Sequence, residues 1–215
     1  ALHTRAAYYD AETGINTKTY QHITDFAAEY GIEYILLDEG WAIDGKPLEL
    51  NPDINISEIV SHAKAKGVGV FLWMAWDQVE MCFDTIFKQY KDWGVDGVKI
   101  DFMDRSDQWM VDYYERMAAE AAKHRLFIDF HGSFKPAGLE YKYPNVLSYE
   151  GVRGQEQNRG CTPDNSIFYP FMRNAVGPMD YTPGVINTFQ PEYYLSTHYN
   201  GGGIGTRAYQ MALFV

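Results

Sequence analysis

Short apolar runs alternate with amphipathic stretches along the chain, which is the pattern of strands followed by helices. Near-continuous apolar runs are found at residues 32–40, 67–76, 95–103, 126–132 and 146–154, and a further strand is predicted at 176–184. Helical spacing is found at 56–67, 82–94 and 106–125. Strands of this kind are typical of a parallel sheet that helices cover. Since no linker or low-complexity tract divides it, the pattern predicts an α/β fold in a single domain over 1–215.

Polar and aromatic residues follow the apolar runs at the carboxyl ends of the predicted strands. In chain order they are Asp38, Glu39, Trp41, Trp76, Asp77, Lys99, Asp101, His131, Glu150, Arg153 and Asp180. In a (β/α)8 TIM barrel all strands end at one mouth, where active sites are built. A doubly wound open sheet would concentrate chemistry at one switch point instead. The spread over successive strands favours a TIM barrel, incomplete in this chain, with about six of its eight βα units.

The stretch from Gly94 to Gln108, GVDGVKIDFMDRSDQ, carries two charged residues within a buried strand. Side chains alternate along a strand, so Lys99 and Asp101 share one face and the apolar residues around them share the other. A structural ion pair is one explanation, but a buried pair barely offsets its own desolvation. A functional use of the pair is therefore the favoured interpretation.

Composition narrows the choice of partners. The formal net charge is −11, the pI is about 4.9, and no run rich in lysine or arginine occurs. This balance argues against nucleic acid or an anionic membrane surface as a partner. Aromatic residues make up 16% of the chain, which suits stacking on sugars but also suits a tyrosine-rich core. Cys82 and Cys161 have no metal or redox spacing, so the sequence does not decide whether they pair.

Acids at strand ends suit glycoside hydrolysis, which uses two carboxyl groups that flank the scissile bond. Asp101 fits the ionised group, because the neighbouring cation of Lys99 favours a carboxylate. Glu156, beyond another strand end, could serve as the acid. A metal centre built on His131 and several acids is a second possibility, but the chain has only 6 histidines and lacks an early His-x-His. A sugar-binding module without catalysis is the third, and the carboxylate pair makes the hydrolase the preferred interpretation.

Five motifs, in order, resemble glycoside hydrolase family 97. They are YILLDEGW, GVGVFLWMAW, GVDGVKIDFMDRSDQ, YEGVRGQE and AVGPMDYTPG, and the resemblance covers about residues 14–215. It implies an α-glucosidase or α-galactosidase made of an N-terminal β-sandwich, a central (β/α)8 barrel and a C-terminal β domain. This chain would then be most of the barrel, without the two β domains. Periplasmic or secreted localisation is also implied.

The resemblance also implies a mechanism. Retaining members of the family carry an aspartate nucleophile at the end of the fourth barrel strand, and Asp101 matches that position. Inverting α-glucosidases instead carry a glutamate base directly after a histidine of the fifth strand, whereas Gly132 follows His131 here. The expected activity is hydrolysis of terminal non-reducing α-galactosides with retention of configuration. An α-glucosidase, or an inactive carbohydrate-binding homologue, is the alternative.

The expected site residues follow from strand-end positions and from the resemblance. Asp101 is the expected nucleophile and Glu156 the acid/base, with their carboxyl groups ~5–5.5 Å apart. The residues expected to contact substrate are Asp38, Glu39, Trp41, Trp76, Lys99, His131 and Arg153. The family holds Ca²⁺ beside the catalytic centre, and Glu150 and Glu156 match its ligands, although calcium needs about 6–8 oxygens. Trp73 is expected to pack in the core, and Asp104 and Asp107 to cap the next helix.

Overall fold

The protein is described by a computed structural model that covers residues 13–195 and 201–214. Its centre is a parallel five-stranded sheet with the strand order β1-β4-β5-β6-β7. The strands are β1 (Tyr34–Leu37), β4 (Gly69–Ala75), β5 (Gly97–Asp101), β6 (Phe127–Phe130) and β7 (Val146–Tyr149). All five lie within runs that the sequence predicts as strands, so the predicted α/β fold with a parallel sheet is confirmed.

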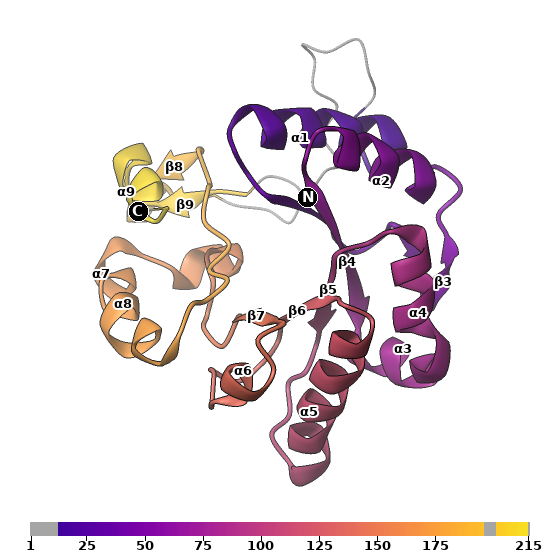
Figure 1. Cartoon of the computed structure of the whole chain (residues 1–215). Coiled ribbons are helices and arrows are strands. Elements are labelled where there is room, and N and C mark those ends of the chain that lie inside the picture. The colour runs from indigo at the N-terminus through magenta and orange to yellow at the C-terminus, as the bar shows by residue number, and fades with distance from the viewer. Residues whose placement is uncertain (1–12, 196–200, 215) are drawn as a thin grey trace.

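Helices connect the strands and pack on one side of the sheet (Figure 1). They are α1 (Thr17–Glu29), α2 (Ile56–Ala65), α3 (Trp76–Met81), α4 (Phe83–Trp93), α5 (Gln108–Lys123) and α6 (Leu139–Lys142). The side chain of Asn16 caps α1, that of Asn55 caps α2 and that of Asp107 caps α5 by accepting backbone N–H groups, as asparagine and aspartate do at helix starts. The prediction that Asp107 caps this helix is therefore confirmed. Gly94 ends α4 in the left-handed conformation that glycine adopts readily.

A small hairpin follows β1 and was not predicted. It consists of β2 (Ala42–Ile43) and β3 (Lys46–Leu50), which pair antiparallel. The phenol of Tyr90 in α4 donates a hydrogen bond of 2.8 Å to the carbonyl of Pro47, which attaches the hairpin to the helical layer. The hairpin thus extends the loop at the end of β1, beside the mouth formed by the strand ends.

The segment after β7 has short elements and lies on the side of the sheet away from the helices, as Figure 1 shows. Its elements are η1 (Gln155–Gly160), α7 (Pro163–Ser166), α8 (Tyr169–Met172), η2 (Asn174–Val176), β8 (Thr188–Phe189), η3 (Pro191–Tyr193), β9 (Gly203–Ile204) and α9 (Arg207–Ala212). The strand predicted at 176–184 is wrong: no regular element spans it. Pro178 and Pro183 lack the N–H that a ladder needs, and Thr182 has a positive φ of 55°.

The two faces of the sheet differ. On the helical side, Leu37, Leu72, Val98, Ile100 and Ile128 are fully buried in one hydrophobic core. The opposite face carries Tyr34, Leu36, Phe71, Lys99, Asp129 and Leu147, which line an open cavity of about 330 Å³. Tyr34 and Leu147 are each about two-fifths exposed there. In the described residues the sheet ends at β1 and β7, so it is open at both edges.

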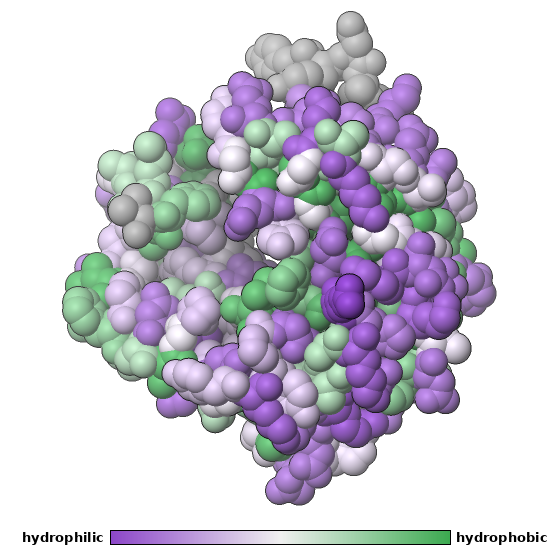
Figure 2. Space-filling model, viewed as in Figure 1, coloured by the Kyte–Doolittle hydropathy of each residue, from purple (hydrophilic) through white to green (hydrophobic). Residues whose placement is uncertain are grey.

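Hydrophilic and apolar residues are unevenly distributed over the surface of the molecule. Figure 2 shows hydrophilic residues over the α3–α4 side and apolar patches over the C-terminal elements. No helix in the described part of the chain is both long and apolar enough to cross a bilayer. Cys82 and Cys161 are both free thiols, so they do not form a disulfide.

Candidate active site

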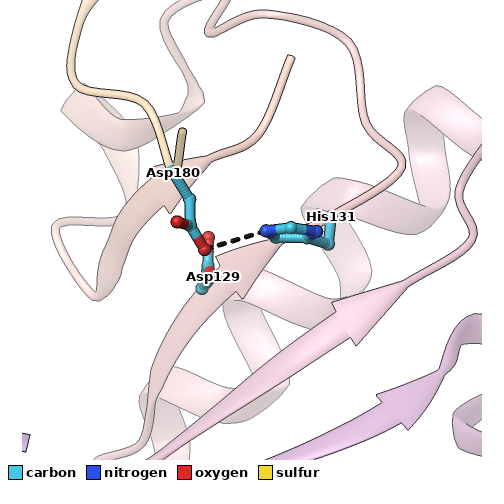
Figure 3. Close-up of side chains that lie close together, drawn as sticks. All are labelled: Asp129, His131 and Asp180. Carbon is cyan, nitrogen blue, oxygen red and sulfur yellow. Dashed lines mark hydrogen bonds and ion pairs between the residues drawn. The ribbon is translucent and has the colours of Figure 1, made fainter. Parts of the chain in front are cut away.

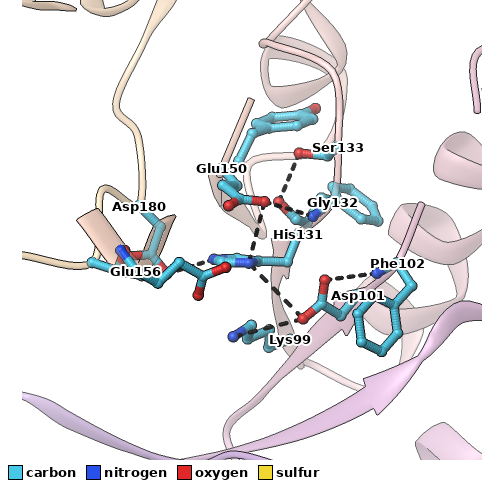
Figure 4. Close-up of polar contacts among 12 residues, drawn as sticks. Lys99, Asp101, Phe102, His131, Gly132, Ser133, Glu150, Glu156 and Asp180 are labelled. Carbon is cyan, nitrogen blue, oxygen red and sulfur yellow. Dashed lines mark hydrogen bonds and ion pairs between the residues drawn. The ribbon is translucent and has the colours of Figure 1, made fainter. Parts of the chain in front are cut away.

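The carboxyl ends of β5, β6 and β7 bring several charged side chains together (Figure 4). Lys99 and Asp101 come from β5, His131 follows β6 and Glu150 follows β7. Lys99 and His131 are buried, and the side chains of Asp101 and Glu150 are only 14% and 12% exposed. The parallel register causes this convergence, since consecutive strands end at the same edge of the sheet. Four of the sequence-predicted residues thus form one cluster.

Asp101 is held through both carboxylate oxygens. Its Oδ1 accepts the backbone N–H of Phe102 at 2.6 Å, and its Oδ2 accepts the indole N–H of Trp73 at 2.8 Å. Phe102 has a φ of 61°, a left-handed conformation that is costly for a bulky residue. Strained backbone of this kind is found most often at functional sites. The Nζ of Lys99 lies 3.8 Å from Oδ2. Asp101 therefore has two donors and a cation around a carboxylate that faces the mouth.

Lys99 joins Asp101 to the end of β1. Its Nζ lies 2.9 Å from Oδ2 of Asp38, whose side chain is about half exposed. Burial alone would lower the pKa of Lys99, but Asp38, through its charge and hydrogen bond, and the charges of Asp101 and Asp180 together raise the pKa above its ordinary value. Lys99 is therefore a firmly charged ammonium between two carboxylates, which answers why a lysine lies inside this strand.

His131 is the hub of the cluster. Its Nε2 lies 2.8 Å from Oδ2 of Asp180, while its Nδ1 lies 3.4 Å from Oε2 of Glu150 and 3.9 Å from Oδ2 of Asp101. Burial opposes the imidazolium, but the hydrogen bond with Asp180 and the nearby acids raise the pKa of His131 above its usual value. A charged His131 would lie between three carboxylates and compensate part of their repulsion.

Asp129 lies behind His131 on the inner face of the sheet. Burial, and next the charge of Asp180, raise the pKa of Asp129 to about 7. Its Oδ1 has no hydrogen-bond partner among the described residues. Oxygen and nitrogen atoms of Asp129, His131 and Asp180 lie within 4.8 Å of one another (Figure 3). Among the described residues, this group is the candidate for the metal centre built on His131. The hydrogen bond between His131 and Asp180 already pairs two of these atoms, so the geometry serves to orient the imidazole.

Glu150 is fixed by the loop after β6. Its Oε2 accepts the backbone N–H of Gly132 at 2.8 Å. Burial raises the pKa of Glu150, and the negative charges of Glu156 and Asp101 add to this effect. Gly132 has a φ of 54°, and a Cβ at this position would lie 3.0 Å from the Cα of Phe102 and from the N of Met103. Glycine is thus required for the two loops to pack together.

Glu156 and Arg153 lie at the rim of the mouth and are exposed. Glu156 belongs to η1, and its backbone N–H donates to Oγ1 of Thr182 at 3.0 Å. In Figure 4 its side chain extends toward the space over Lys99 and Asp101. Arg153 lines a cavity of about 530 Å³ together with Asp104, Gly132 and Glu150. Of the two predicted residues, Arg153 therefore lines the cavity beside the cluster, and Glu156 lies over the cluster itself.

The positions of the tryptophans differ in part from those that the sequence predicts. Trp41, expected to stack on a sugar, is 1% exposed in the core, where its indole N–H donates to the carbonyl of Trp73 at 2.7 Å. Trp73, expected to pack in the core, is indeed buried but reaches Asp101. Trp76 is half-buried, with its ring 5.6 Å from that of Trp109. Trp41, Trp73 and exposed Glu39 line a small cavity of about 210 Å³ beside the hairpin.

Arg173 supports the cluster from the C-terminal segment and was missed by the sequence reasoning. Its guanidinium donates to the carbonyls of Tyr149, Gly151, Gly177 and Pro178 at 2.9–3.2 Å. It is 5% exposed, and burial lowers its pKa. These bonds attach the loop that carries Asp180 to the end of β7. No local sequence signal marks Arg173, because its partners are backbone carbonyls distant along the chain.

Comparisons with known proteins agree with this geometry. The model of the glycoside hydrolase 97 family matches residues 2–152. A protein named retaining alpha-galactosidase from Bacteroides thetaiotaomicron is 40% identical over 213 residues, which are 96% of this chain and 32% of that protein. The chain therefore spans about a third of that relative's length.

Two solved structures are similar to this one. A glycoside hydrolase family 97 enzyme from Pseudoalteromonas sp. strain K8, in complex with acarbose, has a TM-score of 0.73 and 26% identity over 83% of this chain and 32% of its own. A beta-arabinopyranosidase has a TM-score of 0.72 and 28% identity over 90% of this chain and 32% of its own. Together with the family match over most of the chain, they lead to one conclusion: this chain belongs to glycoside hydrolase family 97.

Proposed function

We propose that this chain carries the catalytic centre of a retaining α-galactosidase. The observation that carries the proposal is Asp101, a carboxylate at the end of β5 that has Lys99 and two N–H donors around it and faces an open mouth. A nucleophile of a retaining glycosidase needs to be ionised, oriented and accessible to the anomeric carbon. The name of the Bacteroides relative supports the same reaction.

The reaction would proceed in two displacements. An oxygen of Asp101 forms an ester bond to the anomeric carbon while the bond from that carbon to the leaving oxygen breaks, and Glu156 gives its proton to that oxygen. A water molecule then gives a proton to Glu156, and its oxygen attacks the anomeric carbon, which breaks the ester and restores Asp101. Each step inverts the anomeric configuration, so the product retains it.

The polar rim would bind the sugar. Asp38 and Glu39 offer exposed carboxylates for sugar hydroxyls, Lys99 and His131 offer donors from below, and Arg153 reaches from the other side. Galactose and glucose differ in one hydroxyl, and a site built to bond that hydroxyl rejects the other epimer through unpaired buried groups. The proposal of a galactoside rests on the relative's name, and an α-glucosidase is the alternative.

A calcium ion is part of the proposal. Burial above all, and with it the negative charge of Glu156, raises the pKa of Glu150, and hard carboxylate oxygens suit Ca²⁺. A cation bound there would compensate this charge and polarise a sugar hydroxyl. Two carboxylates leave most of the ~6–8 ligand positions to water or to other parts of the protein. Loss of activity on chelation, restored by Ca²⁺ but not by Mg²⁺, would support this site; activity unaffected by chelation would contradict it.

The finer architecture is also proposed. Five parallel strands with helices on one face, and an inner face lined by side chains, are consistent with part of a (β/α)8 barrel. The remaining strands and flanking β domains would come from the rest of a longer protein, since the relative is about three times as long. We further propose that the protein is periplasmic or secreted.

One assay tests the reaction. The full-length protein is given the p-nitrophenyl α-galactoside and α-glucoside side by side, and NMR follows the first anomer released. We expect preference for the galactoside and release of the α-anomer. A preference for the glucoside would contradict the substrate, and the β-anomer would contradict the mechanism. Asp101→Asn should abolish turnover, and azide should restore it with formation of the β-galactosyl azide.

The similarity to a beta-arabinopyranosidase supports a second candidate substrate. A β-L-arabinopyranoside has the ring stereochemistry of an α-D-galactoside without the hydroxymethyl group. The same nucleophile and acid could therefore act on both. Adding the p-nitrophenyl β-L-arabinopyranoside to the assay distinguishes them: a higher kcat/KM for it than for the galactoside would make arabinopyranosidase the better description.

A further inference from the structure

We infer that Trp73 is a positioning residue for the nucleophile, and that its indole N–H sets the orientation of the Asp101 carboxylate. The inference rests on the proposed function, because the orientation of Asp101 affects catalysis only if Asp101 reacts with the sugar. The contact itself is direct: Nε1 of Trp73 lies 2.8 Å from Oδ2 of Asp101. A hydrogen bond to an ionised acceptor is stronger than one between neutral groups.

The sheet places Trp73 where it can make this bond. Trp73 in β4 is paired with Lys99 in β5, and Ala75 is paired with Asp101. Side chains of paired residues point to the same face, so Trp73, Lys99 and Asp101 share the inner face of the sheet. Ala75 is too small to reach across, which leaves the space beside Asp101 to the longer indole of Trp73.

Trp73 is itself held by its neighbours, through the indole and through the backbone. The residue is 7% exposed, and its indole lies edge-on to the ring of Phe102, with 5.8 Å between centroids. The carbonyl of Trp73 accepts the indole N–H of Trp41. A donor on a fixed strand costs little entropy when the substrate binds, which is what preorganised positioning requires.

Two N–H groups thus define the plane of the carboxylate. Phe102 donates from the chain's own backbone to Oδ1, and Trp73 donates from the neighbouring strand to Oδ2. Lys99 is 3.8 Å from Oδ2 and supplies charge rather than a short directional bond. Without the indole, the carboxylate keeps its charge partner but loses one of the two groups that fix its rotation.

Trapping kinetics of Trp73→Phe test the inference in the full-length protein. The probe is 2-deoxy-2-fluoro-α-galactosyl fluoride: Asp101 forms an ester to its anomeric carbon, the C–F bond breaks and fluoride leaves. Because small misplacements of a reacting group are costly, we expect the inactivation rate constant to fall by about 10- to 100-fold. The dissociation constant of galactose should not change, since phenylalanine keeps the apolar ring.

The matched control is Trp93→Phe. Trp93 is a half-buried tryptophan of α4 that packs on Tyr90 and Trp41, outside the site. It should leave the inactivation rate unchanged even if it lowers stability. If Trp73→Phe weakens galactose binding as much as it slows inactivation, or if its inactivation rate equals that of the wild type, the inference is overturned.

A second measurement does not depend on activity. In protein with ¹⁵N-labelled tryptophan, the indole resonance of Trp73 is identified by its loss in Trp73→Phe. In Asp101→Asn this resonance should move upfield, because an amide oxygen is a weaker acceptor than a carboxylate, whereas the Trp93 resonance should not move. An unmoved Trp73 resonance overturns the inference alone. Full turnover by Asp101→Asn would instead overturn the proposed function and, with it, the role of the contact.

Discussion

Glu150 and Glu156 lie on two sides of the mouth and differ in what holds them. Glu150 is largely buried and bonded to Gly132, whereas Glu156 is exposed and its carboxylate accepts a hydrogen bond of 3.2 Å from the exposed side chain of Gln157. A group that gives a proton to a departing oxygen must reach the substrate, which an exposed side chain can do. This difference in access is why Glu156, rather than Glu150, is the proposed acid.

The first prediction concerns the leaving group. In Glu156→Gln we expect kcat/KM for an α-linked galactosyl disaccharide to fall by roughly 10²- to 10⁴-fold, because a poor leaving group needs the proton. For an aryl galactoside with an acidic phenol, the fall should be far smaller. Steady-state kinetics on both substrates check this, with Glu150→Gln as the comparison, whose losses should not depend on the leaving group. Equal losses on both substrates in Glu156→Gln would contradict the assignment.

The second prediction concerns Asp129. Its pKa of about 7 is above the unfolded value of 3.8, so the folded protein binds this proton more tightly. Stability is therefore lost as the pH rises from about 4 to about 7, and the full cost is present above pH 7. Asp129→Asn removes the charge at constant volume, so it should raise Tm at pH 8 by roughly 2–4 °C and much less at pH 4.

Thermal unfolding at the two pH values checks this prediction. The control is Asp112→Asn on the exposed face of α5, where the carboxylate bonds only Gln108 among the described residues. Because this is a surface substitution, its effect on Tm should be small at both pH values. A lower Tm for Asp129→Asn at pH 8 would mean that the ionised carboxylate is stabilising, contrary to its buried, unpaired oxygen.

At this scale, sequence reasoning found the ionic residues better than the aromatic ones. Lys99, Asp101, His131 and Glu150 follow from strand ends, because the parallel sheet itself collects them. The burial of Trp41 and the contact of the buried Trp73 with Asp101 could not be found that way, since they depend on which strand pairs with which and in what register. Once Trp73 is aligned with Lys99, its position on the inner face follows at once.

At the scale of elements, β5 contains a glycine that makes room for a neighbour. A Cβ on Gly97 would lie 2.3 Å from the ring of Phe71, which stacks parallel to Phe127 on the inner face. Phe71 is buried, and a shift of its ring would disturb its contacts with the rings of Tyr34 and Phe127. The ring pair and the glycine therefore form one packing unit across three strands.

The third prediction follows from this unit. Gly97→Ala should lower the free energy of unfolding by roughly 1–3 kcal/mol, as overpacking in a close-packed core does. Urea titration of the full-length protein measures it. Gly201→Ala is the control, because among the described residues no atom beyond its neighbours in the chain lies within 4 Å of its added Cβ. If the two variants were equally stable, the inner face would be looser than the structure indicates.

Some elements could be predicted from the sequence and others could not, because different interactions stabilise them. The strands β1, β4, β5, β6 and β7 were predictable because they form near-continuous apolar runs, whose residues on the helical side pack in the core. Helix α1 and the β2–β3 hairpin were missed, since their short or mixed patterns give weak periodicity. The loop around Asp180 was taken for a strand because it is apolar, but its carbonyls are bonded by Arg173 instead of by a neighbouring strand.

At the scale of the whole molecule, two apolar surfaces lie open in the described residues. One is the inner face of the sheet around Tyr34 and Leu147, and the sheet edges at β1 and β7 flank it. The other lies over the C-terminal elements (Figure 2), with exposed Phe171, Met172 and Phe214. Open edges and large apolar patches are templates for association.

The fourth prediction is that the 215-residue polypeptide self-associates when it is expressed alone. We expect a size-exclusion elution well ahead of the monomer position and enhanced fluorescence of a hydrophobic dye such as ANS. The full-length protein, in which the proposed barrel strands would cover these surfaces, should bind far less dye. A monomeric 215-residue polypeptide without dye binding would contradict the idea that further chain covers them.

Gly132 has a consequence for how mechanisms can change during evolution. The atoms of Phe102 and Met103 already occupy the space that any side chain at 132 would need, and Asp104 lies as close. A glutamate introduced at this position, which the family resemblance implies as the place of the base in inverting members, would collide with the loop that follows the proposed nucleophile. A change from one stereochemical route to the other therefore takes more than the exchange of single residues, because the loop at 102–104 has to move before a side chain fits at 132.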